Sequence, residues 1–265
     1  MTARRVLNTV LFLAGLYALL AVAGCTLYRQ VLYPAPSAPA PEPPAGSTLR
    51  EFRAEDGVLV HALQFTAPPG ARTVVHFHGN GESIRDVVWF GQALANRGLG
   101  VLLVEYRGYG ASAGSPTEEG LYLDAGAALD ALSADGIGAD RVVLSGMSLG
   151  TGVAAEMASR GRCAALVLIA PYTSIPRVAD RFVPFLPTSL LIGDRFATAD
   201  KTSLIHVPTL VIHGDADEVI PYAMGQEIAA RLGARLFTVP GGHHNDLFGL
   251  RGPELLDAIA AHATK

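Results

Sequence analysis

The chain has few charged residues and few cysteines for its 265 residues. Asp, Glu, Lys and Arg make up only 17% of the sequence, and the formal net charge is −4. A protein that binds nucleic acid needs a basic face, so this composition argues against a nucleic-acid partner. Half of the residues are hydrophobic, and Gly and Pro number 29 and 17. This length and composition are typical of one α/β domain with a large core and many turns.

A long apolar run follows the two basic residues of the N-terminus. Arg4 and Arg5 precede the stretch 6–24, which only Asn8 and Thr9 interrupt. This order matches the charged and apolar regions of a secretory signal. The small residues before Cys25 resemble the end of a bacterial lipoprotein signal, in which the cysteine is lipidated. We therefore expect residues 1–24 to be a lipoprotein-type signal peptide and Cys25 to carry lipid.

The alternative interpretation is an uncleaved, single-pass N-terminal membrane anchor, since 19 apolar residues just suffice to cross a bilayer. Both interpretations place the folded domain in the cell envelope, attached to a membrane and facing the periplasm or the exterior. Thr26 after the cysteine favours the outer membrane, if the organism has one. Lipidation of Cys25 would leave Cys163 without a partner for an intramolecular disulfide. Its apolar neighbours favour a buried packing role over a reactive thiol.

A proline-rich segment separates the apolar run from the domain. Residues 25–47 contain six prolines between positions 34 and 44, which predicts an extended tether. The domain, residues 48–265, begins with two strand-like segments, 49–53 and 58–65. They flank Asp56-Gly57, a strong hairpin signal.

The rest of the domain alternates apolar strands with helices. This alternation predicts an α/β fold with a mostly parallel, mixed sheet flanked by helices. The segment 172–203 breaks the rhythm, because it is longer than an ordinary connection between a helix and a strand. We expect it to form a short cap over the carboxyl edge of the sheet, where open α/β sheets place their sites.

A serine between two glycines lies at a strand-to-helix junction. Ser148, in the sequence Gly-Met-Ser-Leu-Gly, follows a β-rich run and precedes a helical stretch. Such a turn can expose the hydroxyl and aim backbone N–H groups at a reacting carbonyl. A serine needs a base to remove its proton and an acid to orient that base. Ser148 is therefore the candidate nucleophile of a hydrolase.

The acid and the base follow the serine in the chain, each in a loop after a strand. Asp215 and Asp217 are the candidate acids, and the residues alone leave the choice between them open. His243 and His244 are the candidate bases. Adjacent histidines in a simple loop cannot both reach one serine, so one of the two is structural or solvated.

An early loop, 76–81, supplies the fourth element. Acyl transfer generates an oxyanion, and the backbone N–H groups of Asn80 and Leu149 are the candidate donors that stabilise it. His76 and His78 share a strand face, but no third ligand follows at a recognisable zinc spacing. The sequence therefore predicts no metal and no cofactor.

With these motifs in order, the chain resembles the α/β-hydrolase superfamily. More narrowly, it is similar to membrane-attached α/β-hydrolase domain-containing serine hydrolases, related to the serine aminopeptidase and monoacylglycerol lipase-like groups. The matching segments are 78–81, 106–110, 146–150, 213–221 and 244–246, with a further likeness at 30–34. The resemblance implies that Ser148, Asp217 and His244 form the triad, with Asn80 and Leu149 as the oxyanion hole.

We therefore expect an enzyme, a serine hydrolase that cleaves a carboxylic ester or thioester through an acyl-serine intermediate. The apolar cap and the membrane attachment favour a small-molecule or lipid-like acyl substrate. The alternatives are an amidase or peptidase of the same fold and a binding module that has kept the fold without catalysis.

Overall fold

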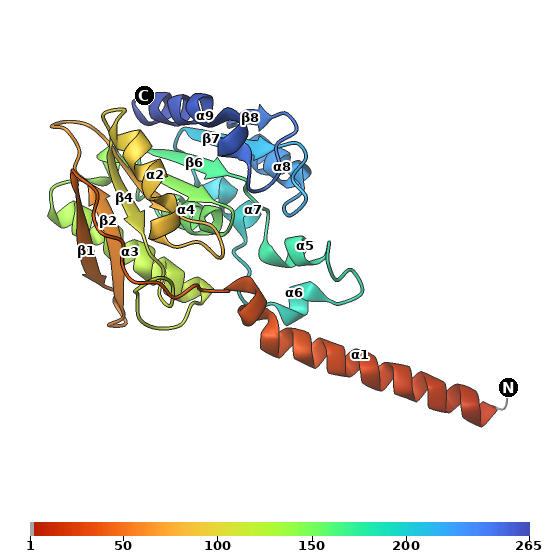
Figure 1. The fold of residues 1–265 in the computed structure, drawn as a ribbon. Helices are drawn as coiled ribbons and strands as arrows, with labels where there is room; N and C mark the ends of the chain where they lie inside the picture. Colours follow the sequence, from red (N-terminus) through yellow and green to blue (C-terminus); the bar gives the residue numbers. More distant parts are fainter. Residues whose placement is uncertain (1–2) are drawn as a thin grey trace.

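The structure is a computed structural model that describes residues 3–265; the first two residues of the predicted signal segment lie outside it. Its centre is an eight-stranded sheet with the order β1-β2-β4-β3-β5-β6-β7-β8 (Figure 1). The strands are β1 (Ser47–Arg53), β2 (Leu59–Phe65), β3 (Thr73–Phe77), β4 (Gly100–Val104), β5 (Val142–Met147), β6 (Ala165–Ile169), β7 (Thr209–Gly214) and β8 (Arg235–Val239).

The sheet is mixed, as the sequence predicts. β1 and β2 form the predicted antiparallel hairpin, and β2 also runs antiparallel to β4. All pairings from β4 through β8 are parallel. Every residue of β3, β4 and β6 is buried, which explains why these strands are continuous apolar runs without alternation. The predicted α/β fold class is confirmed.

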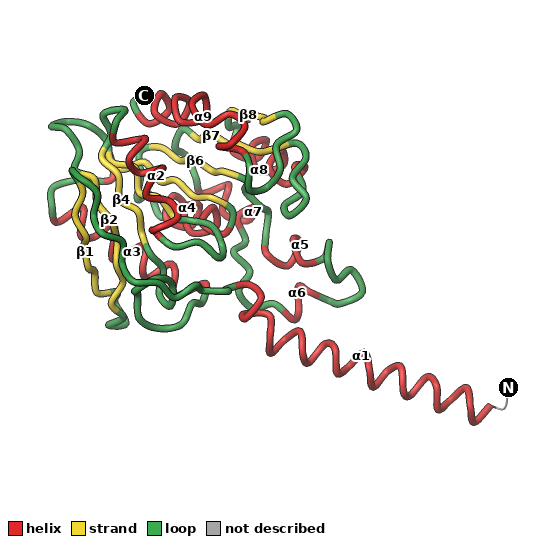
Figure 2. The backbone as a smooth tube through the Cα atoms, viewed as in Figure 1, coloured by secondary structure: helices red, strands yellow, loops and turns green. Residues whose placement is uncertain are grey.

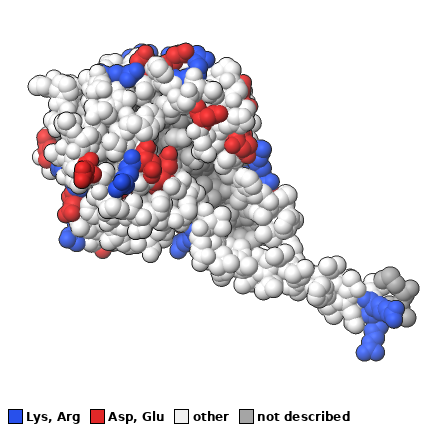
Figure 3. Space-filling view, in the orientation of Figure 1, with Lys and Arg blue, Asp and Glu red and all other residues white. Residues whose placement is uncertain are grey.

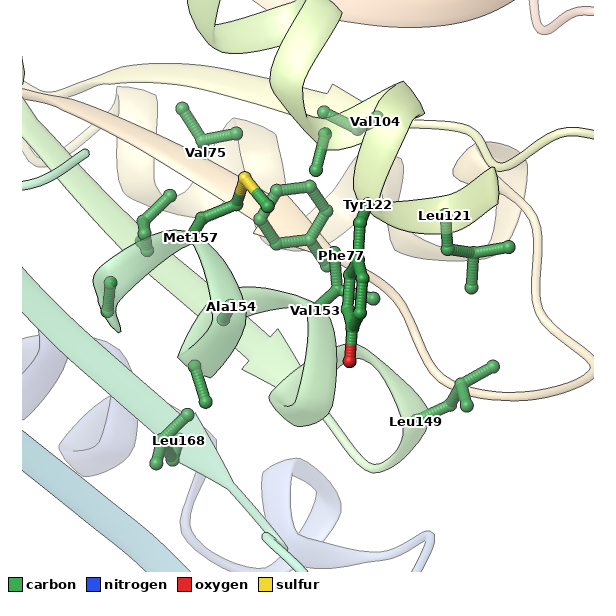
Figure 4. Packing of buried hydrophobic residues seen from close by; sticks show 14 of the residues in the cluster. Val75, Phe77, Val104, Leu121, Tyr122, Leu149, Val153, Ala154, Met157 and Leu168 are labelled. Carbon is green, nitrogen blue, oxygen red and sulfur yellow. The ribbon is translucent and has the colours of Figure 1, made fainter. Parts of the chain in front are cut away.

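Helices cover both faces of the sheet (Figure 1). Residues of α3 (Glu118–Ala134), α4 (Leu149–Ser159) and α8 (Tyr222–Leu232) share one buried cluster with alternate strand residues. Figure 4 shows Phe77 and Val104 of the sheet against Val153 and Met157 in this cluster. Residues of α2 (Ile84–Ala95) and α9 (Leu247–Ala263) belong to the cluster on the other face. Each fully buried aliphatic side chain stabilises the fold by about 1.5–3 kcal/mol. The two clusters therefore fix the sheet between its two layers of helices.

The N-terminal segment is a single long helix, α1 (Ala3–Leu32), that projects from the body of the molecule (Figure 1). It is long and apolar enough to cross a membrane, with a mean hydropathy of 2.3 over its most apolar window. Figure 3 shows an almost uncharged surface along α1 between the basic residues at its free end and the body. Cys25 lies inside this helix and is exposed.

The proline-rich segment after α1 packs against the folded domain. Tyr33 is buried, with only 5% of its surface exposed. The Ala38 amide donates to the Gly110 carbonyl at 3.1 Å, and the Gly110 amide donates to the Pro36 carbonyl at 2.8 Å. These contacts differ from the predicted extended tether, because backbone hydrogen bonds and one aromatic anchor fix the end of α1 to the body.

The segment between β6 and β7 forms a cap of short helices joined by loops (Figure 2). It contains α5 (Ile175–Ala179), α6 (Thr188–Leu191), α7 (Thr198–Lys201) and the 3₁₀ helix η2 (Thr202–Leu204). A second 3₁₀ helix, η1 (Ala139–Arg141), lies outside the cap and precedes β5. α6 packs against α1. The cap thus connects the N-terminal helix to the carboxyl edge of the sheet.

Candidate active site

Ser148 lies on a strained turn between β5 and α4. Its backbone angles are φ 50° and ψ −117°, a left-handed conformation that few non-glycine residues adopt. The flanking glycines make the turn possible. A Cβ atom on Gly146 would overlap the carbonyl of Gly150, and one on Gly150 would overlap the carbonyl of Phe77. The Gly-x-Ser-x-Gly pattern is therefore required by close backbone packing at the top of the central strand.

The structure brings Ser148, His244 and Asp217 together in one chain of hydrogen bonds. The Ser148 Oγ lies 3.0 Å from the His244 Nε2. The His244 Nδ1 lies 2.8 Å from the Asp217 Oδ2. With the proton on Nδ1 donated to the carboxylate, Nε2 faces the serine as an acceptor. This is the tautomer that a general base requires.

The Asp217 carboxylate is held by four donors. Its Oδ1 accepts the backbone amides of Val219 at 2.9 Å and Ile220 at 2.8 Å. Its Oδ2 also contacts the buried His213 Nε2 at 3.2 Å. Burial raises the pKa of the carboxyl, but hydrogen bonds from His213 and His244 outweigh it and hold the pKa below its usual range. The residue is thus ionised wherever a neutral histidine can act as a base.

The rival candidates for the acid and the base point elsewhere. Asp215 is exposed, and its Oδ1 accepts the Gly241 amide at 2.6 Å across the loop. The side chain of His243 is 58% exposed and pairs with Glu218 at 3.0 Å. Asp215 and His243 lie close to Asp217 and His244 in sequence. Their side chains bind other partners and take no part in the hydrogen bonds that reach Ser148.

Asn80 and Leu149, the candidate oxyanion donors, line the same pocket as Ser148. Within residues 3–265, neither backbone amide donates a hydrogen bond to another protein group. The neighbouring Gly79 amide is occupied instead, because it donates to the Glu82 carboxylate at 2.7 Å. Both residues thus have a free backbone donor and line the cavity that contains Ser148, which is consistent with the expected oxyanion hole.

A buried ion pair beneath this loop was not found from the sequence. The His78 Nε2 lies 2.9 Å from the Glu105 carboxylate, and its Nδ1 lies 2.9 Å from the Gly79 carbonyl. Both ring nitrogens face acceptors, an arrangement that favours the doubly protonated ring. Burial lowers the pKa of His78, but the contacts with Glu105 outweigh it and raise the pKa above its ordinary value. The Tyr106 hydroxyl also donates to the His78 carbonyl, at 2.8 Å. These contacts fix the loop that carries Asn80.

The Glu105→Gln substitution is expected to lower the free energy of unfolding by about 3–5 kcal/mol, because it leaves the buried His78 cation without its counter-charge. The raised pKa means that the pair's stabilisation is complete below the unfolded pKa of histidine and is lost as pH rises through the folded pKa. Urea unfolding of the variant and the wild type in the same detergent, at pH values below and above the unfolded pKa of histidine, measures both effects. Glu51→Gln, which alters an exposed carboxylate near His61, is the control. Equal stability of the two variants would contradict this assignment.

Two further residues of the predicted set have structural roles. His76 is buried against the Ser145 hydroxyl at 3.0 Å, and burial lowers its pKa to about 3. It is neutral and turns away from His78, which pairs with Glu105. Burial also raises the pKa of the Cys163 thiol to about 12, which makes it unreactive. The sequence analysis does not identify His213 as a partner of Asp217. Its position at the end of β7, directly before the loop that carries the candidate acids, could have indicated this contact.

An apolar cavity of about 490 Å³ opens beside Ser148. The carboxyl edge of the sheet contributes Asn80, Ser148 and Leu149, and the loop after β7 contributes Val219 and Ile220. The remaining lining comes from α1 and the cap: Gly24, Leu27, Tyr28, Val31, Leu32, Tyr172, Ile175, Val178, Ala179, Phe182, Val183, Leu186, Thr188, Leu191 and Ile192. None of the lining residues is charged, so the cavity suits an apolar group next to the serine.

Comparison with known proteins finds that the chain is similar to hydrolases. The family described as serine aminopeptidase, S33, matches residues 68–192. The uncharacterized protein Rv2307c of Mycobacterium tuberculosis is 35% identical over 247 residues, covering 89% of this chain and 87% of that protein. Alpha/beta hydrolase domain-containing protein 17C of Xenopus tropicalis is 35% identical over 201 residues, covering 74% of this chain and 64% of that protein.

Solved structures show the same fold. The esterase Pf2001 of Pyrococcus furiosus has a TM-score of 0.71 at 20% identity, covering 86% of this chain and 97% of that chain. The esterase RhEst1 of Rhodococcus sp. ECU1013 has a TM-score of 0.64 at 19% identity, covering 82% and 98%. The sheet order, the turn at Ser148 and the similar solved structures all indicate the same fold. The chain has the α/β-hydrolase fold and belongs to one family with the mycobacterial protein Rv2307c.

Proposed function

We propose that the protein is a serine hydrolase that cleaves a carboxylic ester or thioester with an apolar acyl group. The observation that carries this proposal is the hydrogen-bonded series Ser148–His244–Asp217, which ends at an uncharged cavity. A nucleophile, a base in the correct tautomer and an orienting carboxylate are the groups with which a serine hydrolase forms its acyl-serine. The esterases with the same fold support the reaction class.

The reaction follows from the geometry. The Ser148 Oγ attacks the substrate carbonyl carbon while the His244 Nε2 takes its proton. The Asp217 carboxylate stabilises the resulting imidazolium through Nδ1. The amides of Asn80 and Leu149 donate to the oxyanion. The intermediate collapses when the leaving alcohol or thiol takes the proton from His244, and water, activated by His244, then hydrolyses the acyl-serine.

The cavity favours an acyl ester over an aminopeptidase substrate. An aminopeptidase must bind the cationic amino group of its substrate, for which it needs a buried carboxylate near the nucleophile. The described lining of the cavity contains neither Asp nor Glu. An acyl chain, by contrast, gains about 25 cal/mol for each Å² of apolar surface that it buries there.

The membrane attachment that the sequence predicts is part of the proposal. α1 is apolar enough to serve either as an uncleaved anchor or as the signal that precedes a lipidated Cys25. In both cases the domain, with its cap at about 172–203, lies in the cell envelope beside a membrane. Both cases also retain the last residues of α1, 26–32, on the folded body.

A fluorophosphonate probe tests the proposal directly. It is expected to label the folded protein at Ser148, because only an activated serine attacks phosphorus efficiently. Mass spectrometry of the labelled peptide identifies the residue, and heat-denatured protein is the control. A folded protein that takes up no probe, or takes it up away from Ser148, would instead support a non-catalytic binding module.

A further inference from the structure

One wall of the cavity beside Ser148 is the end of α1. Leu27, Tyr28 and Val31 of α1 line it together with Val178 and Phe182 of the cap. The lining runs along α1 from Leu32 to Gly24, and the eight helical steps between these residues span about 12 Å. At its far end Gly24 approaches Leu186 and Leu191 of the cap. The lining therefore extends along this part of the helix, and Ser148 belongs to the same lining.

Partly buried polar contacts hold this wall in place. The Arg29 guanidinium donates to both oxygens of Asp194, at 2.8 and 3.2 Å. The Asp194 amide donates to the Tyr28 hydroxyl at 3.2 Å, and the Asp194 carboxylate accepts the Glu118 amide at the start of α3. Asp194 is buried, so this contact is more than a surface ion pair. α1 is thus joined to the cap and to the body, and Tyr33 anchors the chain directly after it.

The rim of the cavity is apolar on the side of α1. Phe182, Phe185 and Leu190 of the cap are 60%, 61% and 83% exposed. Val31, at the end of α1, is 80% exposed. Large exposed apolar side chains in one region mark a surface that meets an apolar partner. Here that region continues into a helix long enough to cross a membrane, so a bilayer is the partner that the surface fits.

We propose that the last two turns of α1 form the acyl-chain subsite of this enzyme, and that a long-chain acyl ester enters the subsite from the bilayer along the rim of α1 and the cap. This inference rests on the proposed serine hydrolase function and adds the substrate class, a long-chain ester held in a membrane. It also gives the end of α1, which both interpretations of the N-terminus retain, a role in the site, because these residues supply a wall of the cavity.

Blocking the subsite tests the first part. Leu27→Trp in the full chain, reconstituted in phosphatidylcholine vesicles, is expected to lower kcat/KM for p-nitrophenyl palmitate by about tenfold or more, since pockets discriminate by at least this factor for each methylene. The rate for p-nitrophenyl acetate should fall by much less, since its two-carbon acyl group leaves most of the subsite empty. Thr26→Trp is the matched control, because the exposed Thr26 is outside the lining and is rotated by about 100° from Leu27.

Making the rim polar tests the second part. The double variant Phe185→Ser, Leu190→Ser changes side chains outside the cavity lining. It is expected to slow hydrolysis of the palmitoyl ester in vesicles by about tenfold, with no change for the acetyl ester in water. Equal rates in vesicles for this variant and the wild type would overturn entry from the bilayer.

The remaining outcomes separate the subsite from the proposed function. If the wild type hydrolyses the acetyl ester and Leu27→Trp leaves the preference for chain length unchanged, the subsite is wrong and the hydrolase stands. If the wild type hydrolyses neither ester and takes up no fluorophosphonate, the proposed function itself fails, and the subsite with it.

Discussion

Ser148→Ala is expected to lower kcat for p-nitrophenyl butyrate by about 10⁴- to 10⁶-fold, and His244→Ala is expected to lower it by a similar factor. The reason is that the two side chains act as one unit. The Ser148 Oγ can attack only while the His244 Nε2, 3.0 Å away, accepts its proton. Without either partner, only the oxyanion donors and substrate binding still accelerate the reaction.

The double variant Ser148→Ala, His244→Ala distinguishes a joint mechanism from two separate contributions. It is expected to be no slower than either single variant, because the first substitution already disables the unit. His243→Ala should leave kcat close to that of the wild type, since its exposed side chain pairs with Glu218 away from Ser148. Losses that multiply in the double variant, or a loss for His243→Ala as large as that for His244→Ala, would contradict this assignment.

Asp217→Asn is expected to lower kcat by about 10⁴-fold with little change in KM. The amide cannot supply the negative charge that stabilises the His244 imidazolium, and its N–H group favours the wrong tautomer of the ring. The effect should persist at all pH values at which the wild type is active, because the pKa of Asp217 is held below its usual range. Steady-state kinetics across this pH range measures it.

Asp215→Asn is the matched control, two residues away in the same loop. Asp215 accepts the Gly241 amide, so its substitution can shift the loop but removes no charge beside His244. Its kcat should stay close to that of the wild type. A larger loss for Asp215→Asn than for Asp217→Asn would transfer the role of the acid to Asp215.

Much of the fold could be predicted because its signals are local. Uninterrupted apolar strands such as β3 and β4 indicate a sheet buried on both faces, and the Asp56-Gly57 turn indicates the first hairpin. The segment after α1 was harder to predict. Its prolines indicate an extended chain, but they do not reveal that Tyr33 is buried or that residues 36–38 pair with Gly110.

The site divides in the same way. Ser148 could be proposed from a short pattern, since its two glycines are required by backbone contacts with Phe77 and within the turn itself. The choice between neighbouring residues in a loop depends on side-chain direction. His243 and His244, or Asp215 and Asp217, have nearly the same local sequence, and only the packing of two distant loops separates them.

The sequence by itself determined the α/β class, the position of the candidate nucleophile, the order of the candidate acid and base, and the apolar character of the N-terminal helix. Each of these is a property of neighbouring residues or of their periodicity. The tertiary structure alone decided that the side chains of Asp217 and His244, which the resemblance favours, join Ser148 in one chain of hydrogen bonds, that a buried His78–Glu105 pair supports the Asn80 loop, and that the end of α1 forms a wall of the cavity. These are contacts between residues far apart in the chain, and their free energy arises only when the folded core brings the segments together.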